Sequence, residues 1–207
     1  MAIVAICGID GAGKTSTCAA LAAAPTLTGA RVVAKRDRRD VELLRARFPT
    51  AEDHESGLLQ GSYAAAIRWA HALDFLRFYE HEVVPVVDEP LVISDRWTVC
   101  SIAYADVGTA LGPTIGAALA PCRPADLVVY LDITPEQAVH RIAGRGDGQA
   151  DESLAILRRY HDAYDSWLPR LASTVVRIDV DDRAPAEVAA RALEAIGHHM
   201  AARCPSP

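Results

Sequence analysis

The chain has 207 residues, of which 51% are apolar and 23% charged, a composition typical of one globular domain with a sizeable core. Its formal net charge of −6 at pH 7 argues against nucleic-acid binding, because proteins that bind the phosphate backbone usually carry a basic surplus. No apolar run reaches the ~18 residues of a membrane helix, and the first residues lack the pattern of a signal peptide. The five cysteines form no C-x-x-C pair, so we expect a cytoplasmic protein with reduced thiols and no membrane partner.

The chain opens with an apolar run over residues 2–7, followed at once by the segment GIDGAGKT at residues 8–15. This segment matches G-x-x-x-x-G-K-[ST], the P-loop that joins a strand to a helix around a phosphate. Its backbone N–H groups point at phosphate oxygens, its lysine reaches the β- and γ-phosphates, and its threonine can hold Mg²⁺. We therefore predict that ATP is bound by Gly8, Asp10, Gly11, Ala12, Gly13, Lys14, Thr15 and Ser16.

Lysine is rare in this chain, which gives the loop lysine more weight. Of the 21 basic residues only Lys14 and Lys35 are lysines, so composition does not account for a lysine inside the loop. The alternative is a chance glycine-rich turn, but such a turn would require neither the strand before it nor the helix-compatible sequence after it. The sequence therefore favours a phosphate site.

Short β-rich runs alternate with longer helical patterns, which predicts an α/β fold with a parallel sheet and helices on both faces. We expect strands at about 2–7, 31–36, 91–95, 127–132 and 174–179, within a single domain spanning residues 1–207. Ligands of such sheets bind outside the carboxyl ends of the strands. The candidate site residues are therefore those that follow each strand, namely the P-loop, Arg36, Asp37, Asp95, Arg96 and Asp132.

The connections between the strands give further signals. Residues 63–84 show helical periodicity, and this long excursion could build a pocket for the acceptor. In the segment TPEQ, Thr134 is a helix cap, and the pattern predicts a helix to about residue 143. We expect the glycine-rich stretch 141–152 to form a mobile lid and the tail 203–207 to fray.

Phosphoryl transfer depends on positioning the acceptor and on neutralising the spreading negative charge. Arg141 and Arg145 lie one helical turn apart and could fold over the nucleotide, although a solvated arginine-rich face is the alternative. Ala12 favours the lid role, because a small residue in the loop supplies no cation of its own. The predicted catalytic residues are Asp10, Lys14, Arg96, Arg141 and Arg145.

Carboxylates and arginines after the strands suggest two further roles. Asp95 could hold Mg²⁺ through water and, with Thr15, forms the predicted metal site; a strand-end salt bridge is the alternative. Arg96 and Arg36 could bind an acceptor phosphate, and Asp37 could accept a proton from an acceptor hydroxyl. The charged run 36–40 could also be a solvated turn.

These stretches resemble the thymidylate kinases, a P-loop family that moves the γ-phosphate of ATP to dTMP. The matching segments are residues 8–15, 92–97, 101–104 and 124–138, the last continuing to Arg141 and Arg145. The resemblance implies a P-loop kinase fold with a five-stranded parallel sheet, Mg²⁺ and ATP as cofactors, and a lid that carries a catalytic arginine. It also implies a possible homodimer through the long helices.

The sequence departs from this family in the acceptor pocket. Bacterial members carry Arg-Glu-Pro-Gly-Gly after the second strand, whereas residues 36–40 read Arg-Asp-Arg-Arg-Asp. The resemblance places the thymine-stacking phenylalanine on His71 and the thymine-contacting arginine on Phe75, so both contacts are changed. Arg68 or Arg77 could compensate if the helix register differs.

Other acceptor positions are kept. By resemblance, Ser101 is a base contact and Tyr104 a tyrosine that discriminates between sugars. The predicted acceptor site therefore comprises Arg36, Asp37, His71, Phe75, Arg96, Ser101 and Tyr104. Because a site built on one hydrogen-bond pattern rejects analogues that lack it, these changes should alter acceptor choice more than use of ATP.

Three functions remain open at this point. The first is an ATP-dependent phosphotransferase that phosphorylates a nucleoside monophosphate, either dTMP or a related or modified nucleotide. The second is a kinase that phosphorylates a hydroxyl of a nucleoside or specialised metabolite, with Asp37 or Asp10 as the base. The third is a nucleotide-dependent regulatory binding module.

Overall fold

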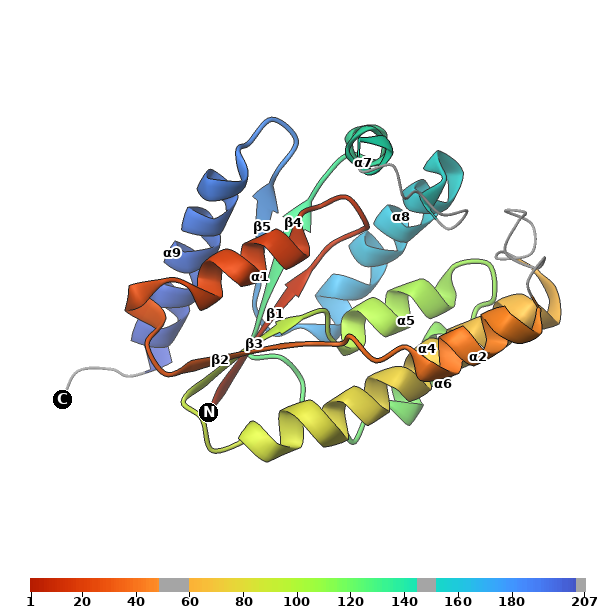
Figure 1. The fold of residues 1–207 in the computed structure, drawn as a ribbon, viewed down its shortest axis with the longest axis horizontal. Coiled ribbons are helices and arrows are strands. Elements are labelled where there is room, and N and C mark those ends of the chain that lie inside the picture. The colour runs from red at the N-terminus through yellow and green to blue at the C-terminus, as the bar shows by residue number, and fades with distance from the viewer. Residues whose placement is uncertain (49–59, 145–151, 204–207) are drawn as a thin grey trace.

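A single parallel sheet organises the chain in a computed structural model that describes residues 1–48, 60–144 and 152–203. Its strands are β1 (Ala2–Cys7), β2 (Ala30–Ala34), β3 (Leu91–Asp95), β4 (Leu127–Asp132) and β5 (Val175–Asp179), in the order β2-β3-β1-β4-β5. Every neighbouring pair is parallel, so all carboxyl ends lie along one edge of the sheet (Figure 1). The predicted five-stranded α/β fold is confirmed.

Helices cover both faces of this sheet (Figure 1). They are α1 (Lys14–Ala22), α2 (Arg39–Arg47), α4 (Gly61–Phe78), α5 (Thr98–Asp106), α6 (Gly112–Ala118), α7 (Pro135–Ala143), α8 (Leu154–Leu171) and α9 (Pro185–Arg203). Short 3-10 turns cover Pro25–Leu27 and Val84–Val86, and a π turn covers Tyr79–Val83. Helix α1 packs with α9, whereas α5 packs with α4, α6 and α8. Within the described ranges no helix combines the length and apolarity needed to cross a membrane.

Most predicted boundaries agree with the structure, because the central strands are continuous apolar runs buried on both faces. Helix α7 begins at Pro135 as predicted, and the Thr134 hydroxyl accepts the N–H of Gln137 at 3.4 Å. The prediction that the second strand, at 31–36, extends to residue 36 was wrong, since β2 ends at Ala34. The charged residues that follow therefore belong to a loop that leaves the edge of the sheet.

A buried carboxylate on α4 fixes the start of α2. Asp74 is fully buried, and its oxygens accept the backbone N–H groups of Asp40 at 2.9 Å and Val41 at 3.2 Å. These N–H groups belong to the first turn of α2 and have no partner within the helix, so Asp74 acts as a cap from another helix. Arg77 reinforces the joint through Asp40 at 2.7 Å and Asp74 at 3.2 Å. The joint also positions the loop between β2 and α2.

Gly112 offers a test of the packing between α5, α6 and α8. A Cβ atom at this position would lie 2.8 Å from Trp167 Cζ2 and 2.9 Å from Asp106 Oδ1, two groups that hydrogen-bond to each other at 3.0 Å. We expect Gly112→Ala to lower the free energy of unfolding by about 1–3 kcal/mol, the usual cost of overpacking. Urea unfolding at equilibrium measures the change.

The matched control is Gly197→Ala in α9, where no atom lies within 4 Å of the added Cβ. We expect this variant to gain about 0.5–1 kcal/mol, because alanine favours the helix and restricts the unfolded chain. Similar unfolding midpoints for the two variants would contradict the proposed packing constraint at Gly112.

Candidate active site

The P-loop lies against the carboxyl end of β4 and against α7. A Cβ atom at Gly8 (φ +148°) would lie 2.6 Å from the carbonyl oxygen of Leu131, and one at Gly11 (φ +85°) would lie 2.8 Å from that of Ala138. Both positions combine a positive φ with a close backbone approach, which only glycine accommodates. Helix α1 then begins at Lys14, so its amino terminus points at the space that the loop encloses.

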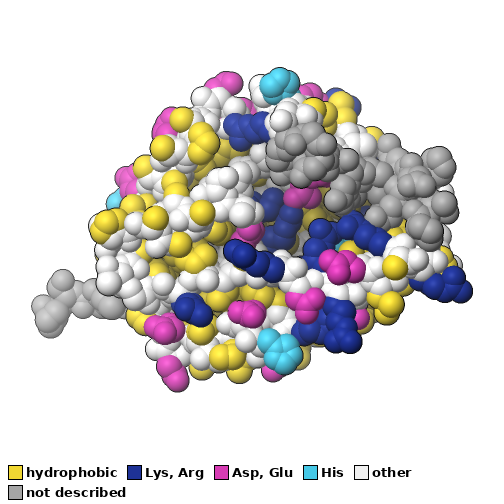
Figure 2. Space-filling model, in the orientation of Figure 1, with side chains coloured by type: hydrophobic (Ala, Val, Ile, Leu, Met, Phe, Trp, Pro, Cys, Tyr) yellow, Lys and Arg dark blue, Asp and Glu magenta, His cyan; other side chains and the backbone are white. Residues whose placement is uncertain are grey.

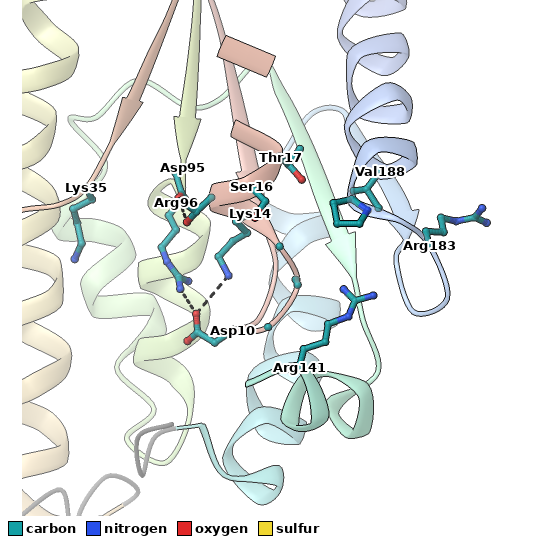
Figure 3. Close-up of a pocket in the computed structure, with 15 residues that line it drawn as sticks. Asp10, Lys14, Ser16, Thr17, Lys35, Asp95, Arg96, Arg141, Arg183 and Val188 are labelled. Carbon is teal, nitrogen blue, oxygen red and sulfur yellow. Dashed lines mark hydrogen bonds and ion pairs between the residues drawn. The ribbon is translucent and has the colours of Figure 1, made fainter. Parts of the chain in front are cut away.

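A cavity of about 540 Å³ opens in front of this loop (Figure 3). The predicted ATP-binding residues from Asp10 to Ser16 all line this cavity. Gly8, the first residue of the loop, is not in its lining and lies against the Leu131 carbonyl. Arg183, Pro185 and Val188, before and within the start of α9, line it as well, and the sequence analysis did not find them. Their sequence carries no phosphate-binding motif, so only the position of α9 beside α1 reveals them.

Asp10 joins two cations at the centre of the site. Its Oδ1 is 3.5 Å from Lys14 Nζ and also accepts a hydrogen bond from Arg96 Nη2 (Figure 3). Burial would raise the pKa of Asp10, but the charges of Arg96 and Lys14 outweigh burial and hold that pKa well below its usual range. Asp10 is therefore a carboxylate that anchors cations and a poor general base.

Arg96 has a strained backbone, with φ at 75° in a region that non-glycine residues rarely adopt. Its N–H donates to the carbonyl of Ile6 at 3.1 Å, and its own carbonyl accepts the Ser94 hydroxyl at 2.7 Å. Its side chain donates to the hydroxyl of Tyr104 at 2.9 Å as well as to Asp10. These contacts aim the guanidinium from the end of β3 into the site.

The predicted metal-site residues meet across α1 and β3. The Thr15 hydroxyl donates to Asp95 Oδ2 at 2.8 Å, and both residues line the cavity. A hydroxyl and a carboxylate are oxygen donors that suit Mg²⁺, which is usually bound by one or two carboxylates together with phosphates and water. No cluster of three His, Cys, Asp or Glu side chains suited to a metal occurs among the described residues.

A second cavity, of about 220 Å³, lies beside the first. Five of the predicted acceptor residues line it: His71 and Phe75 from α4, Arg96 after β3, and Ser101 and Tyr104 from α5. Lys35, Arg38, Cys100, Glu152 and Tyr160 complete much of the wall. Asp10, Lys35 and Arg96 line both cavities, so these three residues form their common boundary.

Aromatic rings and a neutral imidazole form the far wall of the second cavity. Phe75 packs edge-on against Trp97 with ring centroids 5.7 Å apart, and Tyr104 stacks on Tyr160 at 4.1 Å. Burial, and then the charge of Lys35, lowers the pKa of His71 well below its ordinary value, so this imidazole is neutral at pH 7. The wall therefore offers ring faces and uncharged hydrogen-bonding groups.

Arg36 and Asp37 lie elsewhere, in a third cavity near the end of α4. Asp37 accepts the N–H of Arg39 at 3.0 Å and lies 3.8 Å from Arg77, so the contacts of its carboxylate are structural. The structure thus does not bring either residue to the second cavity, because β2 ends at Ala34 and the loop after it turns Arg36 and Asp37 toward the third cavity. Lys35 and Arg38 occupy the cavity instead.

The predicted compensating arginines have other contacts. Arg77 is bound to Asp40 and Asp74 in the joint between α2 and α4. Arg68 is buried, with its guanidinium carbon 5.5 Å from the ring centroid of Tyr160. Neither is among the residues described as lining the second cavity, although Arg68 lies behind one of its aromatic walls.

Of the two arginines predicted to belong to a lid, Arg141 lies in the first cavity and Arg145 lies outside the described residues. Arg141 Nη2 donates to the carbonyl of Asp181 at 2.8 Å and to that of Val180. These contacts hold Arg141 on the side of the cavity next to Arg183 and Val188 (Figure 3). Figure 2 shows cationic side chains gathered over the middle of the viewed face, with acidic side chains among them.

Comparison with known proteins gives consistent matches over most of the chain. The sequence profile of a family described as "Thymidylate kinase" matches residues 6–189. A protein of Pyrobaculum aerophilum named "Probable thymidylate kinase" is 30% identical over 203 residues, which cover 95% of this chain and 96% of that protein. A "Thymidylate kinase" of Alkalilimnicola ehrlichii is 29% identical and covers 90% and 88% of the two chains, and one of Xanthomonas campestris pv. campestris is 31% identical and covers 70% and 62%.

The pairing of Thr15 with Asp95 leads to a test with Mg²⁺. We expect Thr15→Val to raise the Mg²⁺ concentration needed for half-maximal activity by about tenfold or more, since even loss of an outer-shell partner costs roughly 10–100-fold in metal affinity. Titration of activity with Mg²⁺ at saturating nucleotide measures the shift. Thr15→Ser keeps the hydroxyl and should titrate like the parent protein; a parent-like titration of Thr15→Val would exclude Thr15 as a ligand.

Proposed function

This chain belongs to the thymidylate kinase family, and on that premise we propose how its two adjoining cavities divide the reaction. The activity of the chain is the ATP-dependent phosphorylation of a nucleoside monophosphate. We assign ATP to the larger cavity and the acceptor to the smaller one. The shared boundary of Asp10, Lys35 and Arg96 is the observation that carries this assignment.

The larger cavity suits a nucleoside triphosphate from end to end. Phosphates would lie against the loop N–H groups, where the amino terminus of α1 and Lys14 favour negative charge. The base would lie toward Arg141, whose planar guanidinium can stack on an aromatic ring, and toward the apolar side chain of Val188. Mg²⁺ held by Thr15 and Asp95 would bridge phosphate oxygens and neutralise part of their charge.

The boundary between the cavities is where the phosphoryl group would pass. Lys14 and Arg96 already converge there on Asp10, so their charges are in place before any phosphate binds. Lys35 adds a cation on the acceptor side, with its Nζ held 3.3 Å from the carbonyl of His71. Preorganised cations of this kind stabilise the charge that develops on a transferring phosphoryl group, and they align acceptor and donor.

The smaller cavity suits a nucleoside monophosphate, with dTMP or a related nucleotide as the proposed acceptor. Lys35, Arg38 and Arg96 would bind the phosphate. The rings of Phe75 and Tyr104 would contact the base and sugar, while neutral His71 and Ser101 supply hydrogen bonds. Because both groups can donate or accept, this wall allows more than one pattern of base substituents.

The alternative of a hydroxyl acceptor has little support in this geometry. One proposed base, Asp37, lines a different cavity. The other, Asp10, is buried, but the charges of Arg96 and Lys14 hold its pKa low. A weak base is a poor proton acceptor for a hydroxyl. The three cations of the smaller cavity favour an acceptor that already carries a phosphate.

A panel of acceptors tests the assignment. We expect Mg²⁺-ATP to yield ADP with at least one of dTMP, dUMP, dCMP, CMP, UMP and the purine monophosphates, with the diphosphate identified by mass. The matching nucleosides should give only background release, because they lack the group that the cations bind. Turnover of nucleosides alone would favour the hydroxyl kinase, and tight ATP binding without any turnover would favour a binding module.

Lys14→Ala is the control that ties turnover to this site. We expect kcat to fall by about 10²–10³-fold or more, the usual cost of removing one preorganised donor, while circular dichroism shows that the fold is kept. Near-normal turnover would rule out the assigned role of the P-loop.

Lys35 makes a separate prediction about pH. Burial lowers the pKa of Lys35 to about 8, so its charge is present below that pH and lost above it. The second pKa of a phosphate is about 6, so the charge of the acceptor phosphate does not change as the pH rises through 8. We therefore expect kcat/KM for the acceptor to fall above about pH 8, as the neutral amine stops attracting the phosphate.

The measurement is kcat/KM against pH from about pH 6 to pH 10 for the parent protein and for Lys35→Arg. The arginine keeps its charge, so the falling limb near pH 8 should disappear in this variant. If kcat/KM of Lys35→Arg still fell near pH 8, the fall would have to be assigned to a group other than Lys35.

A further inference from the structure

Two cysteines meet beneath the active site, and the proposed reaction uses neither of them. Cys7 is the last residue of β1 and directly precedes the P-loop, while Cys100 lies in the first turn of α5. Their Sγ atoms are 3.4 Å apart, although the two residues are separated by 93 positions in the chain. Both side chains are buried, with 0% of Cys7 and 3% of Cys100 exposed, and of the two only Cys100 lines the acceptor-side cavity.

The surroundings of Cys100 favour its thiolate. Its Sγ lies 3.5 Å from the backbone N–H of Trp97, at the amino terminus of α5, where the helix dipole stabilises negative charge. Burial would raise the pKa of Cys100, but the hydrogen bond with Cys7, the charge of Arg96 and the hydroxyl of Tyr164 outweigh burial and lower it. Burial raises the pKa of Cys7, so the pair consists of one thiolate-forming sulfur and one protonated partner.

The other described cysteines lack these features. Cys18 and Cys122 are buried, and neither lines the acceptor-side cavity. Burial raises the pKa of Cys18 to about 12 and that of Cys122 to about 11. They therefore serve as internal references for the reactivity of Cys100.

We propose that Cys100 is a site of oxidation by peroxides entering through the acceptor-side cavity, and that Cys7 resolves the oxidised sulfur as a disulfide. Both the access route and the resolving partner follow from the position of Cys100 between the cavity and Cys7.

The chemistry balances with a peroxide as the only oxidant. The Cys100 thiolate attacks one peroxide oxygen, an S–O bond forms, the O–O bond breaks, and hydroxide or alkoxide leaves and takes up a proton. Cys100 is then a sulfenic acid. The Cys7 sulfur attacks the Cys100 sulfur, the S–O bond breaks, and the thiol proton leaves with the hydroxyl group as water. A dithiol returns both sulfurs to the reduced state.

Formation of the disulfide would distort the active site. The sulfurs must approach from 3.4 Å to about 2.05 Å, which draws the first turn of α5 toward the end of β1. Helix α5 carries Ser101 and Tyr104, and Cys7 is followed by Gly8, which lies so close to the Leu131 carbonyl that a Cβ atom there would be 2.6 Å from its oxygen. Oxidation should therefore abolish phosphoryl transfer until the bond is reduced.

The test treats the folded protein with hydrogen peroxide, blocks the remaining thiols with N-ethylmaleimide and maps the products by peptide mass. We expect a Cys7–Cys100 disulfide and loss of activity that dithiothreitol restores. Cys100 should react at least about tenfold faster than Cys122. Even a thiol of ordinary pKa holds ~100 times more thiolate than Cys122, whose pKa is raised to about 11. The thiolate of lower pKa is a weaker nucleophile by a factor of about ten, which leaves an advantage of about tenfold.

Two variants separate the roles of the sulfurs. Cys7→Ala should stop at a sulfenic acid on Cys100 that dimedone traps, and Cys100→Ser should form no disulfide and retain its own untreated activity after treatment. Cys122→Ser is the control and should oxidise like the parent protein. Each variant is compared only with its own untreated form, so a change in its basal rate does not affect the comparison.

A nucleotide tests the access route. Saturation with the monophosphate identified by the acceptor panel should slow oxidation of Cys100, whereas ADP in the other cavity should slow it less. Equal rates for Cys100 and Cys122, or labelling of Cys100 only after denaturation, would overturn the proposal. Because the disulfide is read by mass, the result does not depend on whether the proposed acceptor is correct.

Discussion

The ion pairs of Asp10 hold the active site together. The cationic side chains of Lys14 and Arg96 converge on Asp10 and repel each other. Burial, and then the charge of Arg96, therefore lowers the pKa of Lys14. The carboxylate between them, 3.5 Å from Lys14 and hydrogen-bonded to Arg96, allows both cations to remain there without a bound anion. In the proposed reaction, cations positioned in this way would need little reorganisation during phosphoryl transfer.

This interaction also fixes the geometry of the backbone around it. Arg96 keeps its left-handed conformation because its N–H, its carbonyl and its guanidinium all have partners from neighbouring segments. On the opposite side, Gly8 and Gly11 let the P-loop lie against the carbonyls of β4 and α7 at distances that a Cβ would not permit. The strain and the glycines serve the same end, since both bring backbone and charge close to one small volume.

The second cavity depends on a contact outside the P-loop. Asp74 caps α2 from within α4, and Arg77 joins the two helices through Asp40. The short loop between β2 and α2 is thus held at both ends, which directs Lys35 and Arg38 into the acceptor-side cavity. A buried polar joint in one pair of helices therefore decides which cations an acceptor would meet. Its partners are all satisfied, as a buried carboxylate requires.

The sequence by itself determined the features that local patterns encode: the P-loop, the apolar strands, the cap at Thr134 and the polar residues after β3. Only the tertiary structure decided which side chain of the charged run faces the acceptor-side cavity, because a strand end two residues earlier exchanges Arg36 for Lys35. It also decided the contact of Asp10 with Arg96, 86 residues away, and that of Cys7 with Cys100. Composition and periodicity report on neighbours along the chain, whereas these contacts arise from the order of the strands.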